Sequence, residues 1–172
     1  SRSFSTSTSP HACQLITCPR VDEYATAHTS NLPSARLLQS ILTHTKHLAP
    51  ERAHMISGKL QCSLMYQLLR LVGPSANVLE IGTFTGYSLV SMMDAIDNQG
   101  RIVSLEVDPQ IASIARAYVE QHPRHQQVTI QVGDAVQSIN NYVQLHQQSP
   151  DTYPSFDFVY IDANKKQYLQ YY

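Results

Sequence analysis

Several features that mark common protein classes are scarce in this chain of 172 residues. Only 15% of the residues are charged, the twelve lysines and arginines are scattered, and the formal net charge is -1, so no basic surface for a phosphate backbone is expected. The longest apolar stretches, such as Phe158 to Ile161, are far shorter than the roughly 20 residues that cross a bilayer. The composition therefore argues against nucleic acid as a partner and excludes a membrane.

Cysteine is also scarce. Cys13, Cys18 and Cys62 are odd in number and form no CxxC pair, which suits a reducing compartment better than a disulfide scaffold. The 42% of hydrophobic residues are enough for one ordinary core in a chain of this length. A single globular domain is expected.

The N-terminal stretch differs in composition from the rest. Residues 1–20 are rich in Ser and Thr, include Arg2 and Arg20, and contain no acidic residue. This composition fits a transit peptide and, equally, a plain disordered tail. We therefore expect residues 1–30 to be a disordered or targeting tail, and the compartment to be cytoplasmic or mitochondrial.

Two segments that follow have apolar residues at helical spacing. The first covers residues 34–48 and stops before Pro50. The second runs from about Gly58 to the Gly73-Pro74 break, and Ser57 is placed to cap it. Both are expected to be amphipathic helices that pack on the remainder of the chain.

From residue 78 onwards, a short apolar run followed by a helical pattern recurs four times. The expected strands are residues 78–81, 102–107, 128–132 and 156–161, and the expected helices are residues 87–96, 109–121, 135–147 and from 165 onwards. Asp108 followed by Pro109 is a typical helix start. The alternation predicts an α/β fold with an open parallel sheet and helices on both faces.

Ligands of such sheets bind at the carboxyl ends of the strands, so the residues that follow each strand are the candidate site. Gly82 and Gly86 would let the backbone approach a ligand closely, and Glu106 is placed to accept hydrogen bonds from a ribose diol. The spacing Gly82-x-x-x-Gly86 is not the G-x-G-x-x-G of dinucleotide folds, which disfavours a nicotinamide cofactor. Each of these features alone is weak evidence for a ligand site, and the interpretation depends on their occurrence together.

In their order along the chain, these motifs resemble the catechol and caffeoyl-CoA O-methyltransferase family, a cation-dependent class I group that uses S-adenosylmethionine. The matching motifs are Glu80-x-Gly82-x-x-x-Gly86-Tyr87-Ser88, the acid in Ser104-Leu105-Glu106-Val107-Asp108, Gly133-Asp134-Ala135, and Asp162-Ala163-x-Lys165-x-x-Tyr168. The likeness covers roughly Met55 to Tyr172. It implies a Rossmann-like methyltransferase fold and methyl transfer to a hydroxyl of a small catechol-like or caffeoyl-CoA-like acceptor.

The resemblance also implies a role for each matched residue. Asp162 would ligate Mg²⁺ or another divalent cation, and Lys165 would be the general base that removes the hydroxyl proton. Met55-Ile56-Ser57 is similar to the family's entry motif, which adds Ile56 to the cofactor residues. The remaining cofactor residues are Glu80, Gly82, Thr83 and Ser88 at the methionine end, Glu106 at the ribose hydroxyls, and Asp134 and Ala135 beside the adenine.

Structural explanations stay open for several of these residues. Glu80 could accept backbone hydrogen bonds at a strand end, and Asp162 could cap the helix that begins near Lys165. Ser88 could be an ordinary helix hydroxyl and Glu106 a solvated acid. The histidine pairs 44/47 and 122/125 have a spacing of three, but no carboxylate or cysteine accompanies them, so they are expected at the surface.

The chain departs from the family pattern after its fourth strand. The family has seven strands in the order 3-2-1-4-5-7-6, and its second and third metal ligands follow the fifth. Residues 31–172 are therefore expected to be an incomplete methyltransferase domain whose apolar edge strand makes the chain poorly soluble or partnered, with a homodimer left open. The alternatives are a non-catalytic remnant that acts by binding, a tRNA methyltransferase of the same family and, last, a nicotinamide dehydrogenase.

Overall fold

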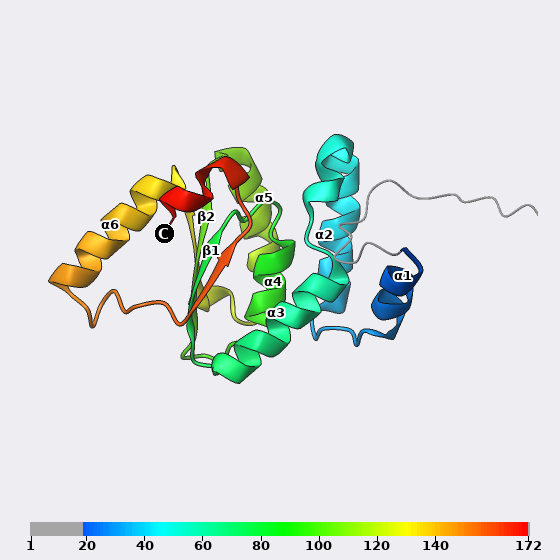
Figure 1. The fold of residues 1–172 in the computed structure, drawn as a ribbon, viewed down its shortest axis with the longest axis horizontal. Helices are drawn as coiled ribbons and strands as arrows, with labels where there is room; N and C mark the ends of the chain where they lie inside the picture. Colours follow the sequence, from blue (N-terminus) through cyan, green and yellow to red (C-terminus); the bar gives the residue numbers. More distant parts are fainter. Residues whose placement is uncertain (1–18, 172) are drawn as a thin grey trace, which may run out of the picture.

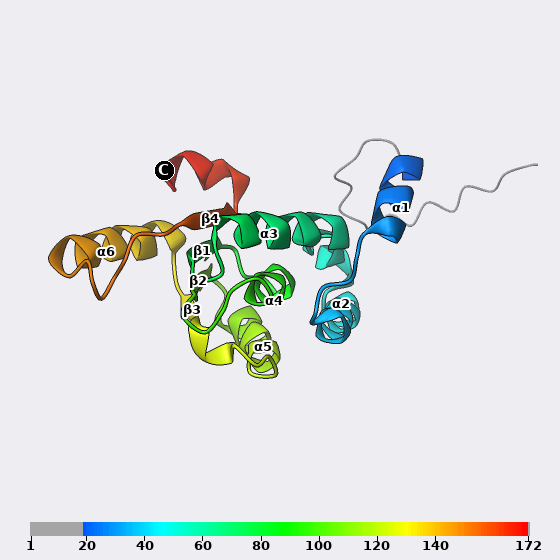
Figure 2. The ribbon, with the colours of Figure 1, turned by 90° about the horizontal axis from the view of Figure 1, so that it is seen from below.

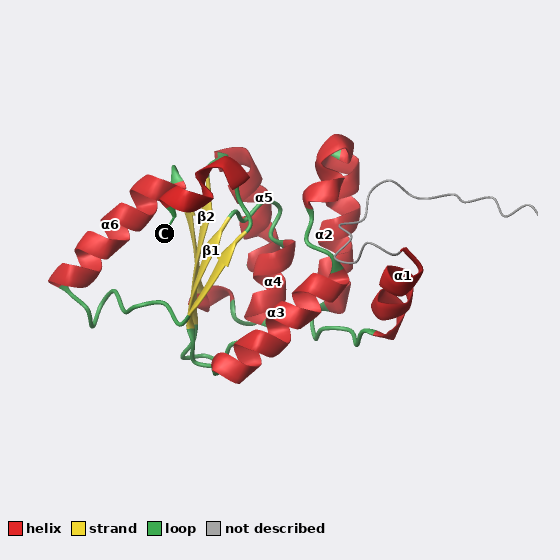
Figure 3. Cartoon of the chain, in the orientation of Figure 1, coloured by secondary structure: helices red, strands yellow, loops and turns green. Residues whose placement is uncertain are grey.

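The computed structural model describes residues 19–171, and its centre is a parallel sheet (Figures 1 and 3). The strand order is β3-β2-β1-β4. The central strand β1 (Asn77–Ile81) pairs with β2 (Arg101–Glu106) and β4 (Phe158–Ile161), and β3 (Val128–Val132) lies beyond β2. Because all described strands are parallel, their carboxyl ends meet at one edge of the sheet.

Helices cover both faces of the sheet, as the sequence predicts. One face carries α3 (Lys59–Val72), α4 (Tyr87–Met93) and α5 (Pro109–Val119), and the other carries α6 (Ala135–Gln148) (Figure 2). Helix α2 (Ala35–Leu48) packs outside α4. Among the described residues, none of the helices is both long enough and apolar enough to cross a membrane.

The alternation of side chains along the strands produces two cores of unequal size. Val78, Ile102 and Ile130 point to α2–α5 and belong to the larger core, which also contains most of the buried helix residues. Leu79 and Leu105 point the other way, into a smaller core beneath α6. The helix-rich side therefore holds most of the buried apolar surface.

Short 3-10 helices lie between or after the longer elements: η1 (Pro50–Met55), η2 (His125–Gln127) and η3 (Lys165–Gln170). The last one stands where the sequence predicts an α-helix from residue 165. The predicted helix over residues 87–96 is also shorter, because α4 ends at Met93.

Of the two helix caps predicted from the sequence, one is confirmed and one is wrong. The Asp108 carboxylate accepts hydrogen bonds from the backbone N–H groups of Gln110 and Ile111, so it caps α5 as predicted. Ser57 does not cap α3, because Gly58 occupies the cap position and the Ser57 hydroxyl bonds to the Asp162 carboxylate instead.

Helix α1 (Pro19–His28) lies in the stretch that the sequence predicts to be a tail. His28 stacks on Tyr24 one turn earlier, and Lys59 Nζ donates to the Thr26 carbonyl oxygen at 3.5 Å, which connects α1 to the start of α3. The structure thus describes a helix within the stretch for which the sequence predicts a disordered or targeting tail. The rest of that prediction, residues 1–18 with Cys13 and Cys18, lies outside the described residues.

Candidate functional site

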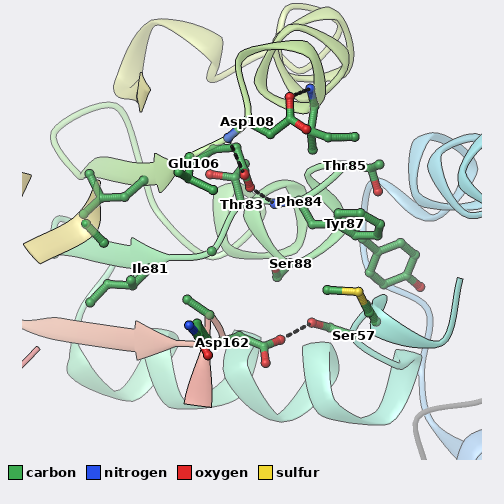
Figure 4. Close-up of a pocket in the computed structure, with 18 of the residues that line it drawn as sticks. Ser57, Ile81, Thr83, Phe84, Thr85, Tyr87, Ser88, Glu106, Asp108 and Asp162 are labelled. Atoms are coloured by element: carbon green, nitrogen blue, oxygen red, sulfur yellow. Dashed lines mark hydrogen bonds between the residues drawn. The ribbon is translucent and has the colours of Figure 1, made fainter. Parts of the chain in front are cut away.

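A cavity of about 660 Å³ opens at the carboxyl ends of β1, β2 and β4, a volume typical of small-molecule sites. Its walls come from the β1–α4 loop, the residues that follow β2, β3 and β4, and the connection from η1 to α3. Figure 4 shows Glu106 and Asp162 on opposite sides of the cavity. The predicted site residues in its lining are Ile56, Gly82, Thr83, Ser88, Glu106, Asp134, Ala135 and Asp162.

Glu106 stands at the end of β2 with both carboxylate oxygens held by backbone donors. The Phe84 N–H donates to Oε2 at 2.8 Å, and the Asp108 N–H donates to Oε1 at 3.0 Å (Figure 4). Each carboxylate oxygen can accept more than one hydrogen bond, so both keep room for a further donor. Glu106 thus offers two fixed acceptors, as its predicted role at a ribose diol requires.

The structure places Glu80 beneath the cavity and not in its wall. Its side chain is fully buried and accepts hydrogen bonds from the hydroxyls of Ser88 and Ser104, and the Thr83 hydroxyl contacts that of Ser104. Burial raises the pKa of Glu80 to about 8, because the loss of hydration outweighs the two hydroxyl donors. Its influence on a ligand therefore passes through Ser88 and Thr83, which do line the cavity.

The two glycines of the β1–α4 loop adopt positive φ angles, 103° for Gly82 and 90° for Gly86. A Cβ atom on Gly82 would lie 2.5 Å from the carbonyl oxygen of Asp162, and one on Gly86 would lie 3.3 Å from the Ala115 side chain. The sequence interpretation assigns these glycines to the close approach of a ligand. In the structure, the absence of a side chain at Gly82 lets the residue after β4 pack against the loop, and the absence of one at Gly86 lets α5 do so.

Asp162 follows β4 and is held by two hydroxyl groups. Its Oδ2 accepts from Tyr160 at 3.0 Å and from Ser57 at 3.3 Å, and Gln61 Nε2 donates to the Tyr160 oxygen at 2.6 Å. Burial raises the pKa of Tyr160 well above its usual range, so this hydroxyl stays protonated as a donor. The other oxygen, Oδ1, has no hydrogen-bond partner among residues 19–171.

Asp162 does not cap η3, since Asn164 accepts from the Lys166 N–H instead.

The described residues contain no cluster of side chains typical of a metal site. Nowhere in residues 19–171 do three His, Cys, Asp or Glu side chains gather in a way that could hold a metal ion. Asp162 brings one carboxylate, whereas hard cations such as Mg²⁺ need several oxygen ligands.

Lys165 lies outside the cavity lining. It begins η3 and its side chain is exposed to solvent. Asp134 does line the cavity and also caps α6, because its carboxylate accepts the Gln137 N–H at 2.9 Å. Of the site residues predicted from the sequence, Lys165 and Glu80 are the two that do not line the cavity: Lys165 is exposed to solvent and Glu80 is buried.

Some lining residues have no role predicted from the sequence. Arg52 and Met55 come from η1, and Thr85 lies between the two loop glycines. Tyr171 both packs beneath α6 and lines the cavity.

The charge of the cavity wall favours a cationic ligand. Carboxylates come from Glu106, Asp108, Asp134 and Asp162, against the single guanidinium of Arg52. An excess of negative charge attracts a sulfonium or ammonium group. The wall therefore suits a positively charged small molecule.

Comparison with known proteins agrees with this geometry. Residues 27–172 match the family model described as O-methyltransferase. The chain is 31% identical over 133 residues to a catechol O-methyltransferase of Niastella koreensis, covering 77% of this chain and 58% of that protein. It is 30% identical over 104 residues to a caffeoyl-CoA O-methyltransferase of Pinus taeda, covering 60% of this chain and 38% of that protein.

Solved structures with a similar fold include methyltransferases with bound cofactor. An O-methyltransferase from Bacillus cereus in complex with S-adenosylhomocysteine (SAH) superimposes with a TM-score of 0.70 at 28% identity, covering 86% of this chain and 62% of that one. The O-methyltransferase TomG from Streptomyces achromogenes in complex with S-adenosylmethionine gives 0.72 at 25% identity, covering 86% and 61%. These matches confirm the predicted Rossmann-like fold. The chain spans less than two thirds of the length of each of these relatives.

Proposed function

Because the chain belongs to the O-methyltransferase family, we propose that its cavity binds S-adenosylmethionine and serves the transfer of a methyl group to a hydroxyl of a small aromatic acceptor. The observation that carries the proposal is the Glu106 carboxylate, whose two oxygens are fixed by the Phe84 and Asp108 N–H groups at the edge of a carboxylate-rich cavity. A ribose diol needs two such acceptors side by side.

The remaining lining residues fit the other parts of this cofactor. Thr83 and Ser88 would meet its methionine end, with their hydroxyls oriented by the buried Ser104 and Glu80. Asp134 and Ala135 would flank its adenine. When bound, the cofactor supplies a methyl group on a positively charged sulfur, and the negative cavity wall stabilises that charge.

The acceptor is proposed to be a catechol-like or caffeoyl-CoA-like molecule. Support comes from the names of the similar proteins and from the position of Asp162 at the far side of the cavity, with Oδ1 free of partners among the described residues. Assistance by a divalent cation requires oxygen ligands in addition to the Asp162 carboxylate, since no three His, Cys, Asp or Glu side chains gather among residues 19–171. Lys165 as general base requires that η3 move its side chain toward the cavity.

The acceptor proposal is tested by methyl transfer from S-adenosylmethionine to catechol, with Mg²⁺ and with a chelator. Turnover that needs Mg²⁺ and is lost in Asp162→Asn would support both the acceptor and the cation. Cofactor binding without turnover under any of these conditions would favour the non-catalytic alternative.

The cofactor proposal is tested by calorimetric titration with SAH. Glu106→Gln should weaken binding by about tenfold or more, because charged hydrogen bonds to the ligand are lost. Glu120→Gln is the matched control, since Glu120 is an exposed acid at the opposite end of α5 and should bind normally. Equal affinities of the two variants would contradict the proposed role of Glu106, and a folded wild type that does not bind would overturn the proposal.

A further inference from the structure

Helix α2 is fastened to the rest of the fold by a buried polar cluster at its N-terminus. The Ser34 N–H donates to Asp94 Oδ2 at 2.9 Å, its hydroxyl donates to Asp94 Oδ1 at 2.8 Å, and His122 Nε2 lies 3.2 Å from the same Oδ1. Asp94 and His122 are both buried, so the sequence expectation of a surface histidine is wrong for His122. The start of α2 is therefore fixed against the end of α4.

Near its other end, α2 reaches the wall of the cavity through a pair of hydroxyl groups. Thr45 Oγ1 lies 2.8 Å from Thr85 Oγ1 and 2.8 Å from the carbonyl oxygen of Ile41. Thr45 and Thr85 are each 1% exposed. Thr85 lines the cavity from the β1–α4 loop, where Figure 4 shows it beside Tyr87, whereas Thr45 does not reach the lining.

Both hydroxyls are removed from water, and the Thr85 hydroxyl depends on Thr45, whereas Thr45 also contacts the Ile41 carbonyl oxygen. A buried hydroxyl that lacks a partner loses its hydration without compensation. Within residues 19–171, Thr45 is the hydrogen-bond partner recorded for the Thr85 side chain. The rotamer of Thr85 is therefore fixed by a residue that lies 40 positions earlier in the chain.

The same helix is also connected to a second part of the cavity wall. Helix α2 runs directly into η1, and η1 packs back on α2. Arg52 and Met55 of η1 also line the cavity. The C-terminal end of α2 is therefore linked to two segments of the cavity wall, the β1–α4 loop and η1.

We infer that Thr45 is a positioning residue of the cofactor site: its buried hydroxyl holds Thr85 and the β1–α4 loop in the conformation that receives the ligand, and Thr45 does not itself touch the ligand. The inference rests on the proposed function, since the affinity that Thr45 sets is the affinity for the cofactor.

The test is calorimetric titration of SAH into the wild type, Thr45→Val and Thr45→Ser, with urea unfolding of each. Valine keeps the branched shape and removes the hydroxyl, so Thr45→Val should bind SAH about fivefold more weakly, and Thr45→Ser should bind nearly as the wild type does. Ser34→Ala is the matched control, because it loosens the opposite end of the same helix without touching the loop. It should lower stability and leave the SAH affinity unchanged.

The outcomes separate the inference from the proposed function. A wild type that does not bind SAH removes the proposed function. A wild type that binds, together with a Thr45→Val variant that binds equally well while losing stability, makes the role of Thr45 purely structural and overturns the inference. Should Thr45→Val not fold, Thr45→Cys, which has only a weak donor, replaces it with the same two outcomes.

Discussion

Among single residues, Glu80 shows how burial changes the chemistry of an acid. Its pKa is raised from 4.5 to about 8 by burial, so the folded state holds a proton that the unfolded chain releases near pH 4.5. The favourable contribution of this proton is present below pH 4.5 and is lost as the pH rises through the folded pKa. We predict that the stability of the wild type falls, relative to Glu80→Gln, by up to about 1.4 kcal/mol per pH unit between these values.

Urea unfolding of both proteins across this pH range measures the difference. Glutamine can still accept from one serine and donate to the other, so the variant should fold with the same hydroxyl network. Parallel stability profiles for wild type and Glu80→Gln would mean that Glu80 titrates normally.

Gly82 tests the close approach of β4 to the loop. Gly82→Ala places a Cβ atom 2.5 Å from the Asp162 carbonyl oxygen, whereas Gly73→Ala, also at positive φ, meets nothing within 4 Å. We expect Gly82→Ala to lose about 1–3 kcal/mol more stability than Gly73→Ala, because only the first adds a backbone clash to the strain in φ. Equal losses in urea unfolding would show that φ alone requires the glycine.

At the scale of elements, α5 begins with a cap that stability measurements can check. Asp108 accepts the N–H groups of Gln110 and Ile111, and Pro109 occupies the first helical position. Asp108→Ala should cost about 1 kcal/mol of unfolding free energy. Asp108→Ser retains an acceptor oxygen and should lose much less. If the serine and alanine variants are equally destabilised, the Asp108 side chain does not stabilise the protein by capping α5.

The periodic patterns located most elements because each helix and strand buries one face whatever its partner is. The periodicity of α2, α3 and the strands therefore led to nearly correct boundaries. Ser57 failed as a cap because its hydroxyl bonds to Asp162, 105 residues away. A pattern read over a few residues does not contain such a partner.

The location of the candidate site could be predicted from the sequence, but the direction of its side chains could not. Residues after the strands line the cavity because parallel strands end at one edge, which the alternation of strand and helix already implies. The direction of each side chain is not contained in a motif, so Glu80 proved buried and Lys165 exposed. The Phe84 N–H and the Thr45 hydroxyl act through backbone conformation and distant packing, which no local signal reveals.

At the scale of the whole molecule, β4 is an edge of the sheet and has one neighbour, β1, among the described strands. Val159 on this strand is 49% exposed. Open edges of this kind pair with other chains, so we predict that the 172-residue chain self-associates, with a homodimer as the simplest form. Sedimentation at micromolar concentration checks this.

Val159→Lys should shift the chain toward monomer, since a charged side chain discourages pairing at an edge. Val143→Lys is the control, because Val143 is similarly exposed, 48%, but lies on α6. A monomeric wild type would contradict the prediction.

Binding of the cofactor at the carboxyl end of the sheet is tested most directly by amide chemical shifts of the labelled chain during titration with SAH. The Phe84 and Asp108 amides, which donate to Glu106, should shift most strongly. Those of Arg101 and Thr129, near the opposite ends of their strands, should stay in place. Shifts that gather around Arg101 and Thr129, or a folded chain whose amides do not respond to SAH, would contradict a cofactor site in this cavity.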